Sequence, residues 1–307
     1  MEAVIRIEKL TKRYKETQAV KDLSLTVRKG EIYGFIGLNG SGKTTTLRML
    51  LGMIKPTRGS CFLLEEKVKL SNYKLWEKVG YMVETPYAYP ELTVKENLEL
   101  IRKLRLIQDT RAVDHTISEL QLTPYANRKA KHLSLGNAQR LGLAKALLHQ
   151  PEILILDEPV NGLDPAGIVE VRELLRNLAK NKGVTIFLSS HLLSEVALIA
   201  DKIGIIHHGR LIEEFEADRL ESLIERKLLI GTRQNEAAAK ALASQGIACR
   251  IGERGFLEIS GKDMLEKPET VSGILVNNGF SLIHISVEEE SLEAYFLRSI
   301  RKESGEP

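Results

Sequence analysis

The sequence predicts an α/β fold, with a large domain whose strands alternate with helices and a smaller domain after it. Two buried strands carry most of this prediction. Residues 31–36 form a short apolar run that leads into a glycine-rich loop and a helix. Residues 153–156 read ILIL, a run typical of a strand covered on both faces of a parallel sheet. The length of 307 residues also favours one large and one small domain.

Composition and charge limit the class of protein. Hydrophobic residues make up 43% of the chain and charged residues 28%, which is usual for a protein with a packed core. The net charge is +3 and no long run of like charges occurs, so we expect no nucleic-acid partner. No signal-peptide pattern and no run of about 18 apolar residues occur, so we expect contact with a membrane only through a partner. Cys61 and Cys249 lack metal-ligand spacing and are interpreted as small buried hydrophobes in a reducing cytosol.

Each element of the large domain follows from a local pattern. Alternation with period two predicts the N-terminal strands, continuous apolar runs predict the core strands, and apolar residues three and four apart predict the helices. The predicted strands are 4–10, 19–27, 31–36, 79–83, 153–156, 185–189, 202–206 and 210–213. The predicted helices are 44–51, most of 92–148, 168–180 and 192–200.

The pattern changes after about residue 223, so we divide the chain into domains 1–223 and 224–307. The second part has the predicted order β-α-β-β-α-β, which indicates a small α+β domain of the ferredoxin-like type. Its predicted strands are 227–232, 247–251, 255–260 and 282–287, and its predicted helices are 236–245, 270–278 and 291–300. We interpret it as an accessory or regulatory domain.

The glycine-rich loop GLNGSGKT, residues 37–44, matches the phosphate-binding pattern G-x-x-x-x-G-K-[ST] between a predicted strand and a predicted helix. Glycines let several backbone N–H groups converge on one anion, and the helix adds the positive end of its dipole. Lys43 supplies a charge for the β and γ phosphates, and Thr44 supplies a hydroxyl for Mg²⁺. The predicted nucleotide-binding residues of the loop are Gly37, Asn39, Gly40, Ser41, Gly42, Lys43, Thr44 and Thr45.

The sequence ILILDEP, residues 153–159, predicts the second half of the site. Its buried strand delivers Asp157 at the carboxyl end, where ligands bind in open α/β sheets. Asp157 is a candidate for the metal shell, and Glu158 is a candidate for polarising a water. Two adjacent carboxylates after a buried strand need a cation to balance them. ATP and Mg²⁺ are therefore the expected cofactors.

Read with further motifs in a fixed order, these residues resemble the ATP-binding subunit of ABC transporters over about residues 4–213. LSLGN, residues 133–137, is similar to that family's LSGGQ signature, and residues 162–164 are similar to its D-loop. His191, in LSSHLLSE, is similar to its switch histidine. Tyr14 stands where the family stacks an aromatic ring on adenine.

The resemblance implies a fold and a mechanism. The fold is that of a P-loop NTPase, an ABC ATPase domain with a mixed-sheet core and a helical subdomain at about residues 85–148. Two copies would form a head-to-tail homodimer on two ATP molecules. Glu158 would act as the general base on water, and His191 would contact the γ-phosphate.

The signature segment would cover the γ-phosphate that is bound by the other copy of the dimer. Ser134 has a hydroxyl and Gly136 permits close backbone approach at a predicted helix N-terminus, so both suit an anion. Leu135 and Asn137 depart from the family's Gly and Gln. We expect this departure to change how strongly the dimer closes, without abolishing closure.

Glu84, in the stretch VGYMVETPYAYP, stands where the family has a glutamine that reaches Mg²⁺ and the attacking water. A carboxylate ligates Mg²⁺ more strongly than an amide oxygen does, but it cannot donate an N–H bond. The alternative is a solvated residue at a strand end. We predict that Glu84 faces the metal together with Thr44 and Asp157.

Glu84, the run DEPVNGLDP and the later SVEEESLEAYF are similar to ABC exporters that protect bacteria from bacitracin-like and lantibiotic peptides. The resemblance implies that the chain powers separate integral-membrane permease subunits and lies peripherally on the cytoplasmic side of the membrane. Tyr87 and Tyr89 are expected either in the loop that meets the permease or packed on the helical subdomain.

A soluble ABC ATPase that acts on ribosomes or DNA is the main alternative. The ribosome type usually carries two cassettes and the DNA-repair type carries long coiled coils, and this sequence has one cassette and no sustained heptads. LSLGN and His191 argue against a phosphoryl-transferring kinase, and Glu158 argues against a non-catalytic switch. Substrate and direction of transport cannot be read from this subunit, so export rests on resemblance.

Overall fold

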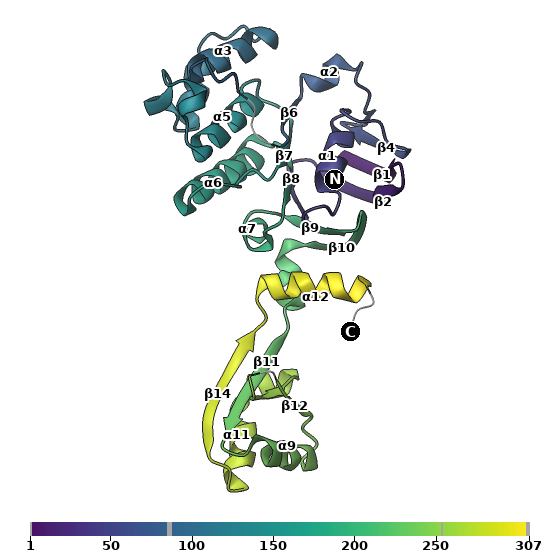
Figure 1. The fold of residues 1–307 in the computed structure, drawn as a ribbon, viewed down its shortest axis with the longest axis vertical. Helices are drawn as coiled ribbons and strands as arrows, with labels where there is room; N and C mark the ends of the chain where they lie inside the picture. Colours follow the sequence, from purple (N-terminus) through teal and green to yellow (C-terminus); the bar gives the residue numbers. More distant parts are fainter. Residues whose placement is uncertain (1, 85–87, 253, 305–307) are drawn as a thin grey trace. The chain divides into compact units, whose positions relative to one another are not determined.

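The computed structural model describes residues 2–84, 88–252 and 254–304. The chain forms two compact units (Figure 1). The first contains Met1–Asp218 and Ser299–Pro307, and the second contains Arg219–Arg298. The accessory role of the C-terminal domain, with its boundary after residue 223, stays a prediction.

A six-stranded mixed sheet forms the core of the first unit and positions the site (Figure 1). Its strands lie in the order β10 (Arg210–Glu216), β9 (Lys202–His207), β3 (Ile32–Ile36), β8 (Thr185–Ser190), β7 (Ile153–Asp157) and β6 (Val79–Met82). All neighbours are parallel except β10 and β9. Every residue of β3, β7 and β8 is buried, which explains their continuous apolar sequences.

A second, antiparallel sheet has the order β2 (Thr17–Arg28), β1 (Ala3–Tyr14), β4 (Arg58–Leu63) and β5 (Glu66–Lys67). The sequence analysis predicted β1 and β2 as shorter strands and missed β4 and β5. Gly59 explains the omission of β4, because it has φ +82° opposite an irregular part of β1. A Cβ at Gly59 would approach the carbonyl oxygen of Lys9 to 2.4 Å. A glycine inside a strand pattern marks such a bulge only once the partner strand is known.

Helices pack on both sides of the core sheet or gather in the predicted helical subdomain. The helices near the sheet are α1 (Lys43–Leu50), α2 (Tyr73–Trp76), α6 (Pro165–Lys182) and α7 (Leu193–Ala197). The subdomain contains α3 (Val94–Leu104), α4 (Ala112–Glu119) and α5 (Leu135–Leu147), and residues 85–87 at its predicted start lie outside the described residues. In Figure 1, α3 and α5 lie together to the left of β6. Among the described residues, no helix is long and apolar enough to span a bilayer.

The ends of α6 show how the sequence sets a helix boundary at the site. Asp164 is the N-cap, and its Oδ1 accepts a hydrogen bond of 3.0 Å from the N–H of Gly167. Pro165 follows as the first helical residue, where a missing N–H costs nothing. Gly183 ends the helix with φ 68°. The predicted D-loop is therefore held at the start of a long, well-capped helix.

The second unit has the predicted β-α-β-β-α-β order with two additional short helices, α8 and α10, among its described residues. Its elements are α8 (Leu220–Leu223), β11 (Arg226–Thr232), α9 (Asn235–Ser244), β12 (Cys249–Ile251), β13 (Leu257–Ile259), α10 (Lys262–Glu266), α11 (Pro268–Asn277) and β14 (Leu282–Glu289), followed by α12 (Leu292–Ser304). The four strands form an antiparallel sheet in the order β12-β13-β11-β14. A separate apolar core lies between this sheet and α9 and α11.

A partly buried histidine gives the first unit a stability that depends on pH. The Nε2 of His149 is 3.1 Å from the carbonyl oxygen of Val79 in β6. Burial, with the nearby Arg105 cation, lowers the pKa of His149 to about 4. The neutral ring is therefore native, whereas the unfolded chain takes up a proton near pH 6.5. The lowered pKa of His149 contributes about 3 kcal/mol to the free energy of unfolding. This contribution is fully present above pH 6.5 and is lost as the pH falls through about 4.

We expect His149→Gln to flatten this pH dependence, because glutamine can donate to Val79 without titrating. The measurement is the urea midpoint of the wild type and the variant from pH 7 to pH 4. The wild type should lose more stability than the variant over this range. Equal losses would show that His149 is protonated in the folded protein.

Candidate active site

The glycine-rich loop begins where β3 ends and closes at the first residue of α1. Gly42 has φ 110°, and a Cβ there would lie 2.5 Å from the carbonyl oxygen of Ala19. A Cβ at Gly37 would lie 2.6 Å from the carbonyl oxygen of Ile206. Only glycine fits either position, because the obstructing atoms belong to the backbone. The loop is therefore held tightly against β2 and β9.

Lys43 places a cation inside the loop. Its side chain is 6% exposed, and Nζ donates to the carbonyl oxygens of Gly37 at 2.6 Å and Leu38 at 3.3 Å. Burial lowers the pKa of Lys43, and the neighbouring carboxylate of Glu158 opposes this effect. The hydroxyl of Ser41 is buried and has no hydrogen-bond partner among the described residues. A phosphate oxygen would satisfy this hydroxyl and Lys43 together, so the loop fits a nucleotide.

Thr44 and Asp157 meet at the end of β7. The Thr44 hydroxyl donates to Oδ2 of Asp157 at 2.8 Å, and the Ser189 hydroxyl donates to Oδ1 at 2.5 Å. Asp157 is only 4% exposed, so these two hydroxyls and the nearby cation compensate its buried charge. Mg²⁺ usually takes one or two carboxylates, waters and phosphate oxygens. A hydroxyl beside one carboxylate fits that donor set, with Thr44 and Asp157 as the residues that would hold the ion.

The carboxylate of Glu158 lies between two basic side chains. Its Oε2 is 2.9 Å from Nδ1 of His191, and its Oε1 is 3.6 Å from Nζ of Lys43. Glu158 has φ 50°, a strained value for this residue type, directly after the buried strand β7. Backbone strain of this kind is typical of active-site residues. The structure thus brings together Lys43, Asp157, Glu158 and His191, which the sequence analysis selected separately.

Gln139 is a buried residue that the sequence analysis missed. It lies on α5 with 4% of its surface exposed, and its Nε2 donates to the carbonyl oxygens of Glu158 and Pro159, both at 3.1 Å. The backbone of Glu158 also donates to the carbonyl oxygen of Ser189 at 3.1 Å. Gln139 therefore connects the helix of the signature segment to the backbone that carries Glu158.

Asn39, Gly40 and Thr45 of the loop and Tyr14 of β1 were also predicted to bind the nucleotide of the same copy. Asn39 and Gly40 are exposed and Thr45 is partly buried. Tyr14 is 44% exposed at the end of β1, and the Nζ of Lys12 lies 4.9 Å from the centre of its ring. An exposed ring is free to stack on a base, so the predicted role of Tyr14 stays open to test.

The signature segment begins α5 as predicted. Ser134 is the N-cap, and its hydroxyl accepts from the N–H of Asn137 at 3.3 Å. Leu135 is 59% exposed, and a Cβ at Gly162 would lie 2.2 Å from its Cδ2. The leucine that departs from the family pattern therefore lies against the D-loop glycine of the same chain. Contact of Ser134 and Gly136 with a nucleotide on another copy stays a prediction.

Glu84 has a partner that the sequence analysis did not foresee. Its carboxylate pairs with the guanidinium of Arg48 on α1 and is 57% exposed. Among the described residues, Glu84 makes no hydrogen bond to Thr44 or Asp157. Its predicted metal-facing role therefore stays a prediction, and it requires the ion pair with Arg48 to open. Tyr87, predicted in the same loop, lies outside the described residues, and Tyr89 is 45% exposed.

We expect Glu84→Gln to raise the Mg²⁺ concentration that gives half-maximal ATP hydrolysis by about tenfold, because one charge–metal interaction is removed. Arg48→Met should lower that concentration, because it releases the carboxylate from its ion pair. The measurement is a Mg²⁺ titration at fixed ATP for the wild type and both variants. An unchanged Mg²⁺ dependence in Glu84→Gln would exclude a metal-facing role.

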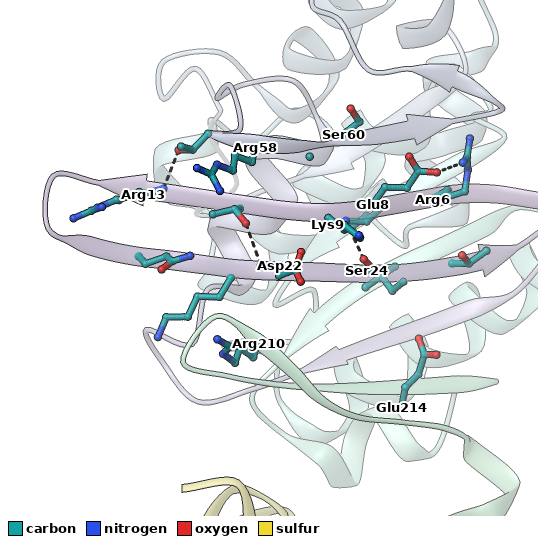
Figure 2. A pocket seen from close by; sticks show the side chains of 18 of the residues that line it. Arg6, Glu8, Lys9, Arg13, Asp22, Ser24, Arg58, Ser60, Arg210 and Glu214 are labelled. Atoms are coloured by element: carbon teal, nitrogen blue, oxygen red, sulfur yellow. Dashed lines mark hydrogen bonds and ion pairs between the residues drawn. The ribbon is translucent and has the colours of Figure 1, made fainter.

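A large hollow elsewhere in the first unit is separate from this site. Figure 2 shows charged and hydroxyl side chains of β1, β2, β4 and β10 around it, and its volume is about 1440 Å³. Ion pairs join Arg6 to Glu8 and Lys202 to Glu214 on its walls. Among the described residues, none of the predicted site residues lines it. Residues of the antiparallel sheet and of β9 and β10 of the core sheet line it.

The fold and the site define a nucleoside triphosphatase of the phosphate-loop class. A family model described as ABC transporter matches residues 20–161. The bacitracin transport ATP-binding protein BcrA of Bacillus licheniformis is 40% identical over 303 residues, which cover 98% of each chain. The lantibiotic transport ATP-binding protein SrtF of Streptococcus pyogenes is 36% identical over 234 residues, which cover 75% of this chain and 100% of that protein. The chain belongs to the ABC transporter family.

Solved structures agree with this assignment over the first unit. A dimeric, post-hydrolysis state of the ATP-binding cassette MJ0796, bound to ADP and Pi, has a TM-score of 0.65 at 26% identity and covers 69% of this chain and 98% of that chain. An ATP-binding subunit of an ABC transporter has a TM-score of 0.64 at 29% identity, covering 71% of this chain and 93% of that chain. The predicted family and the predicted fold are therefore confirmed.

Proposed function

We propose that the chain is the ATP-hydrolysing subunit that powers a separate membrane permease, and that the transport it drives is export of peptide antibiotics of the bacitracin or lantibiotic class. The position of the Glu158 carboxylate, 2.9 Å from His191 and 3.6 Å from Lys43, is the observation that carries the hydrolytic part. A carboxylate held between a histidine and a phosphate-binding cation is placed to take a proton from a water that attacks the γ-phosphate.

In the proposed reaction, water attacks the γ-phosphorus of ATP, the bond to the β–γ bridging oxygen breaks, and ADP and phosphate leave. Glu158 accepts the proton of the water, and Lys43 balances the negative charge on the phosphates. His191 orients Glu158 through their direct contact. Mg²⁺, held by Thr44 and Asp157, would neutralise charge on the phosphate oxygens.

The proposed partners are integral-membrane permease subunits and a second copy of this chain in a head-to-tail dimer. This places the chain peripherally on the cytoplasmic side of the membrane. The similarity to BcrA covers 98% of both chains and therefore includes the C-terminal domain. A match over the whole chain supports a peptide-exporter role more strongly than a match limited to the ATPase domain would. A soluble ABC ATPase on ribosomes or DNA is less well supported, because the relatives named above are described as transport proteins.

The export proposal is tested in the organism from which the gene comes. A strain with Glu158→Gln in its own copy of the gene should become several-fold more sensitive to bacitracin or to a lantibiotic, and unchanged in sensitivity to an antibiotic that acts inside the cell. Equal sensitivity of the mutant and parent strains to every peptide antibiotic tested would contradict export of these peptides. It would leave the ATPase assignment untouched.

A further inference from the structure

The buried side chain of Gln139 binds two consecutive carbonyl groups just after the strand β7. Its Nε2 lies 3.1 Å from the carbonyl oxygen of Glu158 and 3.1 Å from that of Pro159. A carbonyl oxygen only accepts hydrogen bonds, so the amide must turn its NH2 group toward both oxygens and use both of its N–H donors. Because Gln139 is 4% exposed, little water competes for these donors. The side chain therefore fixes two peptide groups at once.

The backbone that Gln139 holds is strained. Glu158 has φ 50°, and a residue with a side chain keeps such a value only where its surroundings hold it. Its N–H donates to the carbonyl oxygen of Ser189, and its carbonyl oxygen also accepts from the N–H of Asn161, both at 3.1 Å. Within the described ranges, Gln139 is the only side chain that bonds to the backbone of Glu158 or Pro159. A single substitution can therefore remove a support of this turn while the backbone hydrogen bonds remain.

The direction of the Glu158 carboxylate depends on this backbone. Its Oε2 lies 2.9 Å from Nδ1 of His191, and its Oε1 lies 3.6 Å from Nζ of Lys43. Among the described contacts, Gln139 makes no hydrogen bond to that carboxylate, so it acts on it through the peptide groups. A general base must lie within hydrogen-bond reach of the water it deprotonates, and a displacement of about 1 Å can cost on the order of a hundredfold in rate.

We propose that Gln139 is a positioning residue for ATP hydrolysis, which holds the peptide groups at Glu158 so that the carboxylate reaches the attacking water. This inference rests on the proposed role of Glu158 as the general base. It extends that role to α5, whose first residues belong to the predicted signature segment. ATP binding does not need Gln139, because Lys43 is held independently by the carbonyl oxygens of Gly37 and Leu38.

Gln139→Met tests the proposal, because methionine is unbranched like glutamine but has no donor. We expect kcat for ATP hydrolysis to fall by about tenfold or more, and the Kd of ATP from calorimetry to stay within about threefold of the wild type. Gln245→Met, at the exposed end of α9 in the second unit, is the matched control and should behave as the wild type. An unchanged kcat, or a Kd that weakens by the same factor as kcat falls, would overturn the proposal.

The combination of Gln139→Met with Glu158→Gln separates positioning from general damage to the fold. If Gln139 acts through the carboxylate of Glu158, Gln139→Met should change the residual rate of the Glu158→Gln protein by less than about twofold. The measurement is single-turnover hydrolysis followed over hours. A further fall by the full factor seen in Gln139→Met alone would show that Gln139 acts in another way, and it would overturn the proposal.

A second variant keeps the test decisive if Gln139→Met fails to fold. Gln139→Asn retains the amide, but it is shorter by a methylene group and cannot reach both carbonyl oxygens, so it should show the same fall in kcat with an unchanged Kd. The Glu158→Gln single variant checks the proposed function itself. A rate near that of the wild type in Glu158→Gln would contradict the general base, whereas failure of the present inference would leave Glu158→Gln slow and the Gln139 variants fully active.

Discussion

Glu158→Gln is expected to lower the rate of ATP hydrolysis by at least about a hundredfold and to leave ATP binding within a few-fold of the wild type. Glutamine keeps the shape of the side chain and its contact with His191, but it cannot take a proton from water. The contacts of the loop with the phosphates do not involve this side chain. This variant should therefore bind ATP almost as the wild type does while hydrolysing it much more slowly.

The measurement for Glu158→Gln pairs phosphate release with the Kd of ATP obtained by calorimetry. Because the variant retains ATP, the proposed head-to-tail dimer should persist in it longer than in the wild type after Mg-ATP is added. Glu213→Gln, at a partly exposed position of β10, is the matched control and should behave as the wild type. A variant that keeps more than about a tenth of the wild-type rate would exclude Glu158 as the general base.

Lys43→Ala is expected to weaken ATP binding by about a hundredfold or more, because it removes the buried cation that faces the phosphates. The same change leaves the carboxylates of Asp157 and Glu158 without their cation, which adds repulsion toward a nucleotide. ATP should raise the melting temperature of the wild type and leave that of the variant unchanged.

The control for Lys43→Ala is Lys240→Ala, an exposed lysine on α9 of the second unit. This control should bind ATP as the wild type does and show the same rise in melting temperature. Thermal unfolding of Lys43→Ala without nucleotide shows whether the variant is folded. Wild-type affinity in a folded Lys43→Ala protein would mean that the nucleotide does not bind in this loop.

Much of the fold follows from local sequence. β3, β7 and β8 are buried on both faces, so their apolar runs were readable without any partner strand. The C-terminal elements were also predicted in the correct order, because each has its own period and its own turn. β4 could not be read in this way, since Gly59 makes sense only beside the irregular part of β1.

The candidate site also contains both residues that the sequence predicts and residues that it does not predict. The loop, Asp157 and Glu158 follow strands that place them, so the chain order alone predicts their meeting. Gln139 and Arg48 are ordinary helix residues in the sequence, and their importance lies in partners far along the chain, Glu158 and Glu84. The residue pattern within one helix does not predict contacts with residues on other elements. A three-dimensional structure was needed to find them.

The most direct test of ATP hydrolysis at this site is phosphate release by the purified wild-type chain with ATP, in the presence of Mg²⁺ and in the presence of EDTA. Mg²⁺-dependent release that rises more than in proportion to chain concentration is the predicted result, because the proposed head-to-tail dimer needs two copies to close on the nucleotide. An absence of release with Mg²⁺, in a protein shown by calorimetry to bind ATP at micromolar chain concentration, would contradict hydrolysis by this chain alone.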